Sequence, residues 1–172
     1  MKKLILLVVA LTTVFVSNAQ TLKEYKAGHV FTVGLPDYMT RTVGLNDVAS
    51  IQYKSDEKDV AGFVIYDTKE ELQLAELSFS SIREFYDGFI GDFLADQENR
   101  KVSEPVLQTK GETHFIECDA TYYDKELDAE IFYHVGVVET KKSFYKVLAW
   151  CSADKKDEFK KDFQKILYSL KD

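Results

Sequence analysis

The sequence contains few of the residues that interrupt regular structure. Only two prolines and eight glycines occur among its 172 residues, whereas 45% of the residues are hydrophobic and 13% are aromatic. It has no internal repeat and no low-complexity segment. This composition excludes a disordered chain and indicates one globular domain with a core of its own.

The chain has fewer basic residues than acidic ones. The chain has 22 lysines and arginines against 29 aspartates and glutamates, a formal net charge of −7 at pH 7. An acidic domain repels phosphate backbones and anionic lipids, which disfavours roles on nucleic acids and membrane surfaces. We expect no nucleic-acid partner and no membrane insertion of residues 20–172. Basic ligands or proteins are mildly favoured.

One apolar run stands at the amino terminus, and no second long one follows. Lys2 and Lys3 precede the apolar residues 4–16, and the small polar segment 17–19 comes next. This order is that of a secretory signal peptide, and the run is shorter than the roughly 20 residues of a membrane-spanning helix, the alternative interpretation. We expect residues 1–19 to be removed and residues 20–172 to form one soluble domain, periplasmic or extracellular.

Stretches rich in β-branched and aromatic residues predict strands. They are residues 30–35, 49–54, 60–68, 113–123, 130–140 and 143–152, with a weaker strand inside 101–109. The polar segments between them, such as 55–59 and 141–142, have the composition of hairpin turns. The second and third strands therefore pair antiparallel, and the last three form an antiparallel meander.

Two stretches show helical periodicity. Apolar residues recur at spacings of three and four over 79–94, where Ser81 and Glu84 predict a capping box. A second amphipathic helix closes the chain: Asp154 is its expected N-cap, and its apolar residues recur at helical spacing from Phe159 to Leu170. The order of elements predicts an α+β domain, in which a twisted antiparallel sheet of about six or seven strands is covered by helices on both faces.

The residues also resemble a known family. The resemblance rests on five segments: FTVGLPDY (31–38), the hairpin through FVIY (63–66), the phenylalanine-rich helix, FYKVLAW (144–150) and the aromatic and aliphatic spacing of 159–169. In element order and aromatic placement they are similar to the PsbP-like fold over nearly all of residues 20–172. The resemblance implies an α-β-α sandwich and an accessory, assembly or binding role, and it transfers no functional residue.

The histidines are His29, His114 and His134. No HExxH, GxSxG or Cys–His pattern accompanies them. The expected register also places His114 and His134 well apart on adjacent strands. We therefore expect no catalytic or metal-binding histidine, and we expect His134 to be an ordinary half-exposed strand residue.

No motif for a metal or a cofactor is complete. Carboxylates alternate over residues 124–130 as in the first half of an EF-hand loop, but Ala129 replaces the required glycine and Val135 replaces the closing glutamate. The stretch predicts a solvated hairpin turn. Gly88 and Gly91 fall inside a predicted helix and form no phosphate-binding loop. We assign no catalytic residue, no metal ligand and no cofactor.

The two cysteines are expected to remain free. With 141–142 as a two-residue turn, Leu148 faces Val135. If the earlier turn is centred between Glu126 and Leu127, Val135 in turn faces Cys118 on the next strand. Cys151 then projects from the opposite face of the sheet, with a strand between the two cysteines, about 9 to 10 Å away. A disulfide cannot span that separation.

Several tyrosines carry a polar tip that suits the edge of the core or, alternatively, a pocket mouth or an interface. They are Tyr38, Tyr53, Tyr66, Tyr122 and Tyr123.

These observations favour an exported, non-enzymatic binding or accessory domain of the cell envelope, which docks a protein partner or a small ligand. A structural component of an envelope complex is one alternative. The other is an envelope hydrolase built from carboxylates such as Asp67, Glu70 or Glu117. A deep pocket with two carboxylates of raised pKa would favour the hydrolase, and an exposed apolar patch would favour docking.

The leader gives the first testable prediction. Signal peptidase accepts small residues such as Ser17 and Ala19, so we expect cleavage after Ala19 and a chain that begins at Gln20. Intact-mass measurement on protein from its native host checks this. Recovery of the chain with residues 1–19 still attached would contradict it.

Overall fold

The computed structural model describes residues 21–28 and 30–172. The expected signal peptide and His29 lie outside the described residues. The strands are β1 (Leu22–Ala27), β2 (Phe31–Pro36), β3 (Thr40–Thr42), β4 (Ile51–Ser55), β5 (Val60–Thr68), β6 (Glu98–Val102), β7 (Val106–Lys110), β8 (Thr113–Asp124), β9 (Ala129–Glu139) and β10 (Ser143–Ser152). The helices are α1 (Lys69–Leu74), α2 (Ile82–Asp92) and α3 (Lys156–Ser169), and a 3-10 turn, Ala153–Lys155, leads into α3.

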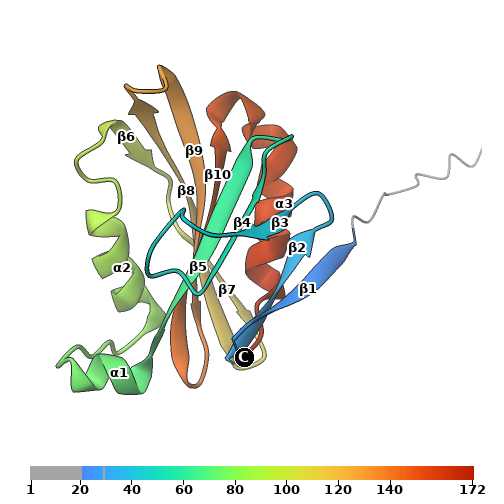
Figure 1. The fold of residues 1–172 in the computed structure, drawn as a ribbon. Helices are drawn as coiled ribbons and strands as arrows, with labels where there is room; N and C mark the ends of the chain where they lie inside the picture. The colour runs from blue at the N-terminus through green and yellow to red at the C-terminus, as the bar shows by residue number, and fades with distance from the viewer. Residues whose placement is uncertain (1–20, 29) are drawn as a thin grey trace, which may run out of the picture.

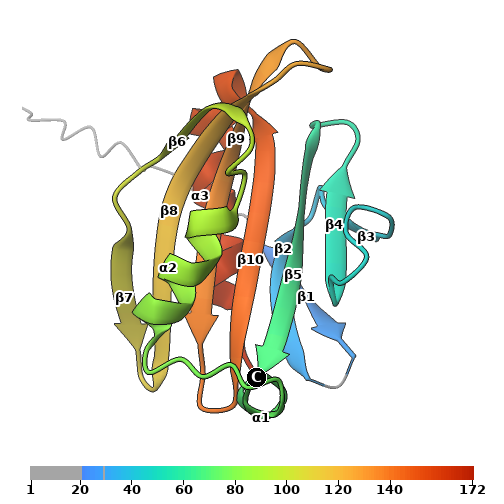
Figure 2. The same cartoon turned by 90° about the vertical axis from the view of Figure 1, so that its left-hand side faces the viewer.

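The fold is a three-layer α-β-α sandwich, as expected. Eight strands form one antiparallel sheet in the order β3-β4-β5-β10-β9-β8-β6, and β7 also pairs with β8. Helix α2 lies over β8 and β9 on one face, and α3 lies on the other face beside the β1–β2 hairpin (Figures 1 and 2). None of the helices within the described residues has the length and apolar character that a membrane crossing requires.

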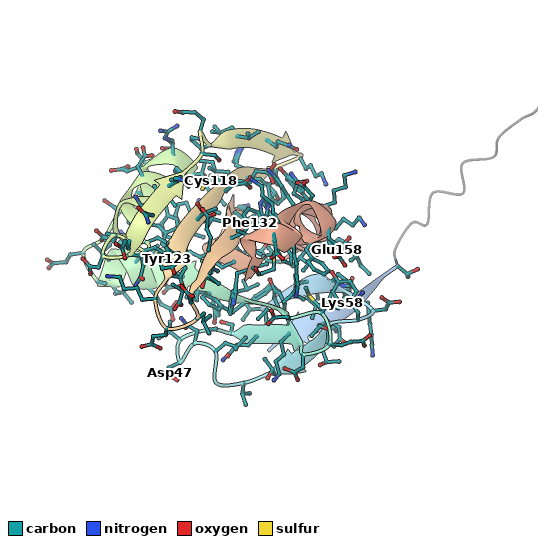
Figure 3. The ribbon with its side chains drawn as sticks, turned by 90° about the horizontal axis from the view of Figure 1, so that it is seen from above. Asp47, Lys58, Cys118, Tyr123, Phe132 and Glu158 are labelled. Atoms are coloured by element: carbon teal, nitrogen blue, oxygen red, sulfur yellow. The ribbon has the colours of Figure 1, made fainter. Side chains whose placement is uncertain are left out.

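Two apolar clusters hold the layers together. On the α3 side, Phe132 of β9 projects toward the helix, and its ring lies 6.4 Å from that of Phe163 (Figure 3). On the α2 side, the ring of Phe85 stacks on that of Phe144 of β10, with centroids 4.4 Å apart. Because strand side chains alternate between faces, each strand of the meander contributes to both clusters.

The register of the meander confirms the expected arrangement of the cysteines. Leu148 pairs with Val135, and Val135 pairs with Cys118. Cys118 belongs to the α2-side cluster and Cys151 to the α3-side cluster, and both thiols are free and buried. Burial raises the pKa of the Cys151 thiol to about 12.

Three short elements were not expected from the sequence. They are β1, β3 and α1, and α1 buries none of its residues. The weak strand expected within 101–109 is in fact two strands, β6 and β7, on either side of Pro105. Proline has no backbone N–H to donate, so pairing along the edge of β8 is interrupted there.

The helix starts differ in part from the sequence expectation. Ser81 is the N-cap of α2 and accepts a hydrogen bond from the Glu84 N–H, but the Glu84 carboxylate accepts from Ser80 rather than from Ser81. The assignment of Asp154 as the N-cap of the last helix is wrong. Asp154 lies in the 3-10 turn and accepts from the Ser152 hydroxyl, and α3 begins at Lys156.

Gly62 allows two neighbouring strands to pack closely against it, and this gives a stability prediction. A Cβ there would lie 2.4 Å from the Tyr53 ring and 2.5 Å from the Leu148 carbonyl oxygen, which itself accepts from the Tyr53 hydroxyl. We expect Gly62→Ala to lower the free energy of unfolding by about 1–3 kcal/mol through overpacking.

Urea unfolding measures this change. The matched control is Gly91→Ala in α2, where a Cβ meets no atom within 4 Å. Because alanine favours a helix over glycine, the control should be neutral or up to about 1 kcal/mol more stable. A Gly62→Ala variant as stable as the unmodified protein would show that this packing is wrong.

Candidate functional site

A pocket opens where α1, α2 and the segment between them meet β5 and β10. We call it the α1–α2 pocket, and its volume is about 450 Å³. Most of its lining is apolar, and three charged side chains interrupt that lining. The lining residues are Asp67, Leu72, Leu77, Phe79, Phe85, Gly88, Phe89, Asp92, Phe93 and Lys146.

The local sequence explains how the walls are placed. Thr68 closes β5 and caps α1, accepting from the Glu71 N–H while the Glu71 carboxylate accepts from the Thr68 N–H. The chain turns away from the sheet there, so Asp67 is left at the pocket wall. The helical period of α2 directs Phe85 and Phe89 to the same wall, at i and i+4.

An ion pair sits in this otherwise apolar lining. The Lys146 ammonium lies 2.9 Å from an oxygen of Asp67, and the two side chains are 21% and 31% exposed. The same ammonium lies 5.1 Å from the ring centroid of Phe85 and 5.8 Å from that of Phe89. Both distances are within the range of cation–π attraction.

A row of half-buried aromatic rings continues from the pocket across the sheet. Phe93 contacts Tyr133 of β9 at 5.3 Å between centroids, Tyr133 contacts Trp150 of β10 at 5.3 Å, and Trp150 contacts Phe63 of β5 at 5.7 Å. Figure 2 shows that α2 does not extend over β5 on this face. The apolar surface is therefore larger than the pocket itself.

A second cluster lies on the opposite face of the sheet, under α3. His134 of β9 is only 2% exposed, which corrects the expectation of a half-exposed residue. Its Nε2 lies 3.2 Å from an oxygen of Glu117, and its Nδ1 lies 3.5 Å from an oxygen of Asp119. From α3, Lys156 and Lys160 reach Asp119 at 2.8 and 2.7 Å.

The charges in this cluster stabilise one another. Burial alone would raise the pKa of both carboxyls, but His134 and the two lysines hold the pKa of Asp119 far below its usual value. His134 and Gln164, whose amide donates to Glu117, likewise lower the pKa of Glu117. Burial would lower the pKa of His134, but the two carboxylates outweigh it and raise that pKa. The imidazole is thus enclosed between strands β8 and β9 and helix α3, and the two carboxylates beside it are the groups that bind α3.

The structure does not bring together the carboxylates named for a hydrolase. Asp67 lines the α1–α2 pocket, Glu117 lies on the opposite face beside His134, and Glu70 is exposed on α1. His114 is exposed on β8, and its Nδ1 lies 3.1 Å from the Thr109 hydroxyl. Within residues 21–28 and 30–172, no three histidine, cysteine, aspartate or glutamate side chains converge to hold a metal ion.

The carboxylate-rich stretch 124–130 forms the turn between β8 and β9, as expected. One oxygen of Asp124 accepts from the backbone N–H groups of Glu126 and Leu127, at 2.9 and 3.0 Å. The hairpin therefore uses this carboxylate to satisfy its own backbone.

The tyrosines occupy different environments. The hydroxyl of Tyr53 is buried against the Leu148 carbonyl, and that of Tyr38 donates to Asp162 at 2.9 Å. Tyr66 packs on Phe31 at the edge of the α3-side core. Tyr122 continues the aromatic row beside Tyr133, and Tyr123 bonds Asp128 in the hairpin.

Sequence reasoning missed Lys146 and Asp92 as pocket residues. A signal for Lys146 was present, because it is the one charged residue in the predicted strand 143–152. Strand alternation places it on the face that Phe144 and Leu148 share.

No family model and no curated protein matches this chain. Its similarity to solved structures is nevertheless extensive. The solution structure of cyanobacterial PsbP (CyanoP) from Synechocystis sp. PCC 6803 has a TM-score of 0.58 at 11% identity and covers 94% of this chain and 98% of that one. The chain has the PsbP-like fold.

Two further structures share it. LpqN, described as involved in cell envelope biogenesis of Mycobacterium tuberculosis, has a TM-score of 0.59 at 10% identity, with 86% of this chain and 88% of that chain covered. PA94 from Pseudomonas aeruginosa, a protein of unknown function and putative regulator, has a TM-score of 0.50 at 5% identity, with 84% and 92% covered. At these identities the likeness establishes the fold alone.

The buried histidine predicts how stability depends on pH. Because the folded pKa of His134 is raised above the unfolded value of about 6.5, its contribution is complete below pH 6.5 and is lost as pH rises through the folded pKa. The pKa values of Glu117 and Asp119 are lowered in the folded state. The stability that these two carboxylates contribute is therefore lost in acid, as the pH falls below about 4.

Urea unfolding from pH 5.5 to 9 measures this dependence. We expect the free energy of unfolding to fall over that range, and His134→Gln to remove most of the fall. The matched control is His114→Gln, because His114 is exposed on the neighbouring strand; it should keep the unmodified profile. An unchanged slope in His134→Gln would overturn the assignment.

Proposed function

We propose that this chain is an exported, non-enzymatic binding domain of the cell envelope, and that the α1–α2 pocket binds a small, largely apolar ligand. The pocket itself carries the proposal. Its volume of about 450 Å³ falls within the 300–1,000 Å³ typical of small-molecule sites. Its lining has the usual form of such sites, which is apolar and aromatic with a few polar groups.

The exposure of the pocket walls supports a binding role. Leu77, in the segment between α1 and α2, lines the pocket and is 51% exposed, and Phe89 and Phe93 of the same lining are only half-buried. Because α1 buries none of its residues, few contacts hold it against the sheet. A ligand that covers these side chains gains the free energy of removing their surface from water.

The fold and the amino terminus support the wider role. LpqN, a protein of the same fold, is described as involved in cell envelope biogenesis, and residues 1–19 have the order of a signal peptide. The volume of the pocket, about 450 Å³, favours a small ligand over a protein partner. The separation of Asp67, Glu70 and Glu117 offers no paired carboxylates for hydrolysis.

Fluorescence titration with the neutral probe N-phenyl-1-naphthylamine tests the site. We expect saturable, blue-shifted emission as the probe leaves water. Phe89→Ser should weaken binding by about tenfold, because it removes roughly 1.5 kcal/mol of apolar contact from the wall.

The matched control is Leu107→Ser, which removes an apolar side chain 57% exposed on β7, outside the pocket. It should bind the probe as the unmodified protein does. Emission that never saturates, or equal loss in both variants, would contradict the assignment of the site.

A further inference from the structure

The lining of the α1–α2 pocket contains more acidic than basic side chains. Asp67 and Asp92 supply two carboxylates, and Lys146 supplies the one cation of the lining. Lys146 is already paired with Asp67 at 2.9 Å. Asp92 is exposed at the last turn of α2, where its backbone carbonyl accepts from the Ala95 N–H, and within the part of the chain that the structure describes its carboxylate has no ion-pair partner. The pocket therefore has a net negative charge at neutral pH.

The neighbouring cations are engaged elsewhere. Arg100 donates to the carbonyl oxygens of Ile90 and Phe93 at the end of α2. Lys69, on the α1 side, is paired with Glu139 at 2.7 Å. Neither residue lines the pocket.

The aromatic walls suit a cation as well. The ammonium of Lys146 already lies over the rings of Phe85 and Phe89, so these ring faces accept positive charge in this fold. Aromatic walls with nearby carboxylates are a recognised way to bind an ammonium group. Phe79 and Phe93 add two more rings to the same lining.

We propose that the α1–α2 pocket selects cationic amphiphiles, with an alkyl or aryl body among the phenylalanines and an ammonium head beside Asp92. This rests on the proposed function and deepens it by naming the ligand class. An anionic head is disfavoured because the one lysine is already neutralised by Asp67. The chain's net charge of −7 acts in the same direction.

Competition between matched ligands tests the inference. The protein is loaded with N-phenyl-1-naphthylamine at pH 7 and low salt, and octylammonium, octan-1-ol or octanoate is then added as a competitor. The three competitors have eight carbons each and differ in the head group. We expect octylammonium to displace the probe at a concentration about tenfold lower than octanoate, as one ion pair with cation–π contact allows. Added salt should reduce this ratio.

Three variants locate the effect. Asp92→Asn should reduce the preference for octylammonium, and Asp67→Asn combined with Asp92→Asn should reverse it in favour of octanoate, because Lys146 is then unopposed. The matched control is Asp87→Asn on the same helix. It changes the net charge equally, but Asp87 pairs with Arg83 at 2.8 Å and lies outside the lining.

The outcomes separate the two proposals. If octan-1-ol displaces the probe but octanoate competes as well as octylammonium, the cationic class is wrong and the binding site stands. The same conclusion follows if Asp87→Asn alters the ratio as much as Asp92→Asn. If neither the probe nor octan-1-ol binds, the proposed function fails, and the inference fails with it.

Discussion

The tight turn between β9 and β10 fixes the register on which the remaining structure depends. The Thr140 N–H donates to the Ser143 carbonyl at 2.9 Å, and the Thr140 hydroxyl oxygen accepts from the Ser143 N–H at 3.1 Å. The Thr140 hydroxyl in turn donates to the side-chain carboxylate of Asp172 at 2.6 Å, and this contact further stabilises the turn. Because side chains alternate, a slip of one residue would move every side chain of β10 to the other face. Lys146 would then leave the α1–α2 pocket.

The two faces of the sheet are held in different ways. On one face, Asp119 binds two lysines of α3 while Phe163 packs into the core, so charge and apolar burial both hold the helix. On the other face, α2 is held mainly by ring contacts such as that of Phe85 with Phe144. This difference explains why the open, apolar pocket lies beside α2. Under α3, by contrast, the charged side chains already pair with one another.

The long elements could be predicted from the sequence because their patterns are strong. The bounds expected for 60–68 and 143–152 match β5 and β10, and the opposite facing of the cysteines followed from the turn at 141–142 together with the turn centred between Glu126 and Leu127. Strands β1 and β3 and helix α1 are short and mostly exposed, so they lack an apolar period that could reveal them.

The sites were harder to predict, for a physical reason. The pocket combines Asp67, Asp92 and Lys146, which are far apart in the sequence and meet only after the sheet is paired. His134 looked ordinary because its partners Glu117 and Asp119 lie on a neighbouring strand and its cover lies on α3. The surroundings of these side chains depend on strand pairing and on burial, and the spacing of residues along the sequence does not reveal either.

The aromatic row has a practical consequence. Trp150 is the single tryptophan of the chain, and it stacks on Tyr133, which in turn contacts Phe93 at the pocket wall. The indole is thus connected to the pocket through one intervening ring. Because the contact runs through Tyr133 to the residue that follows α2, the indole emission serves as an intrinsic optical reporter of a displacement at that end of the helix.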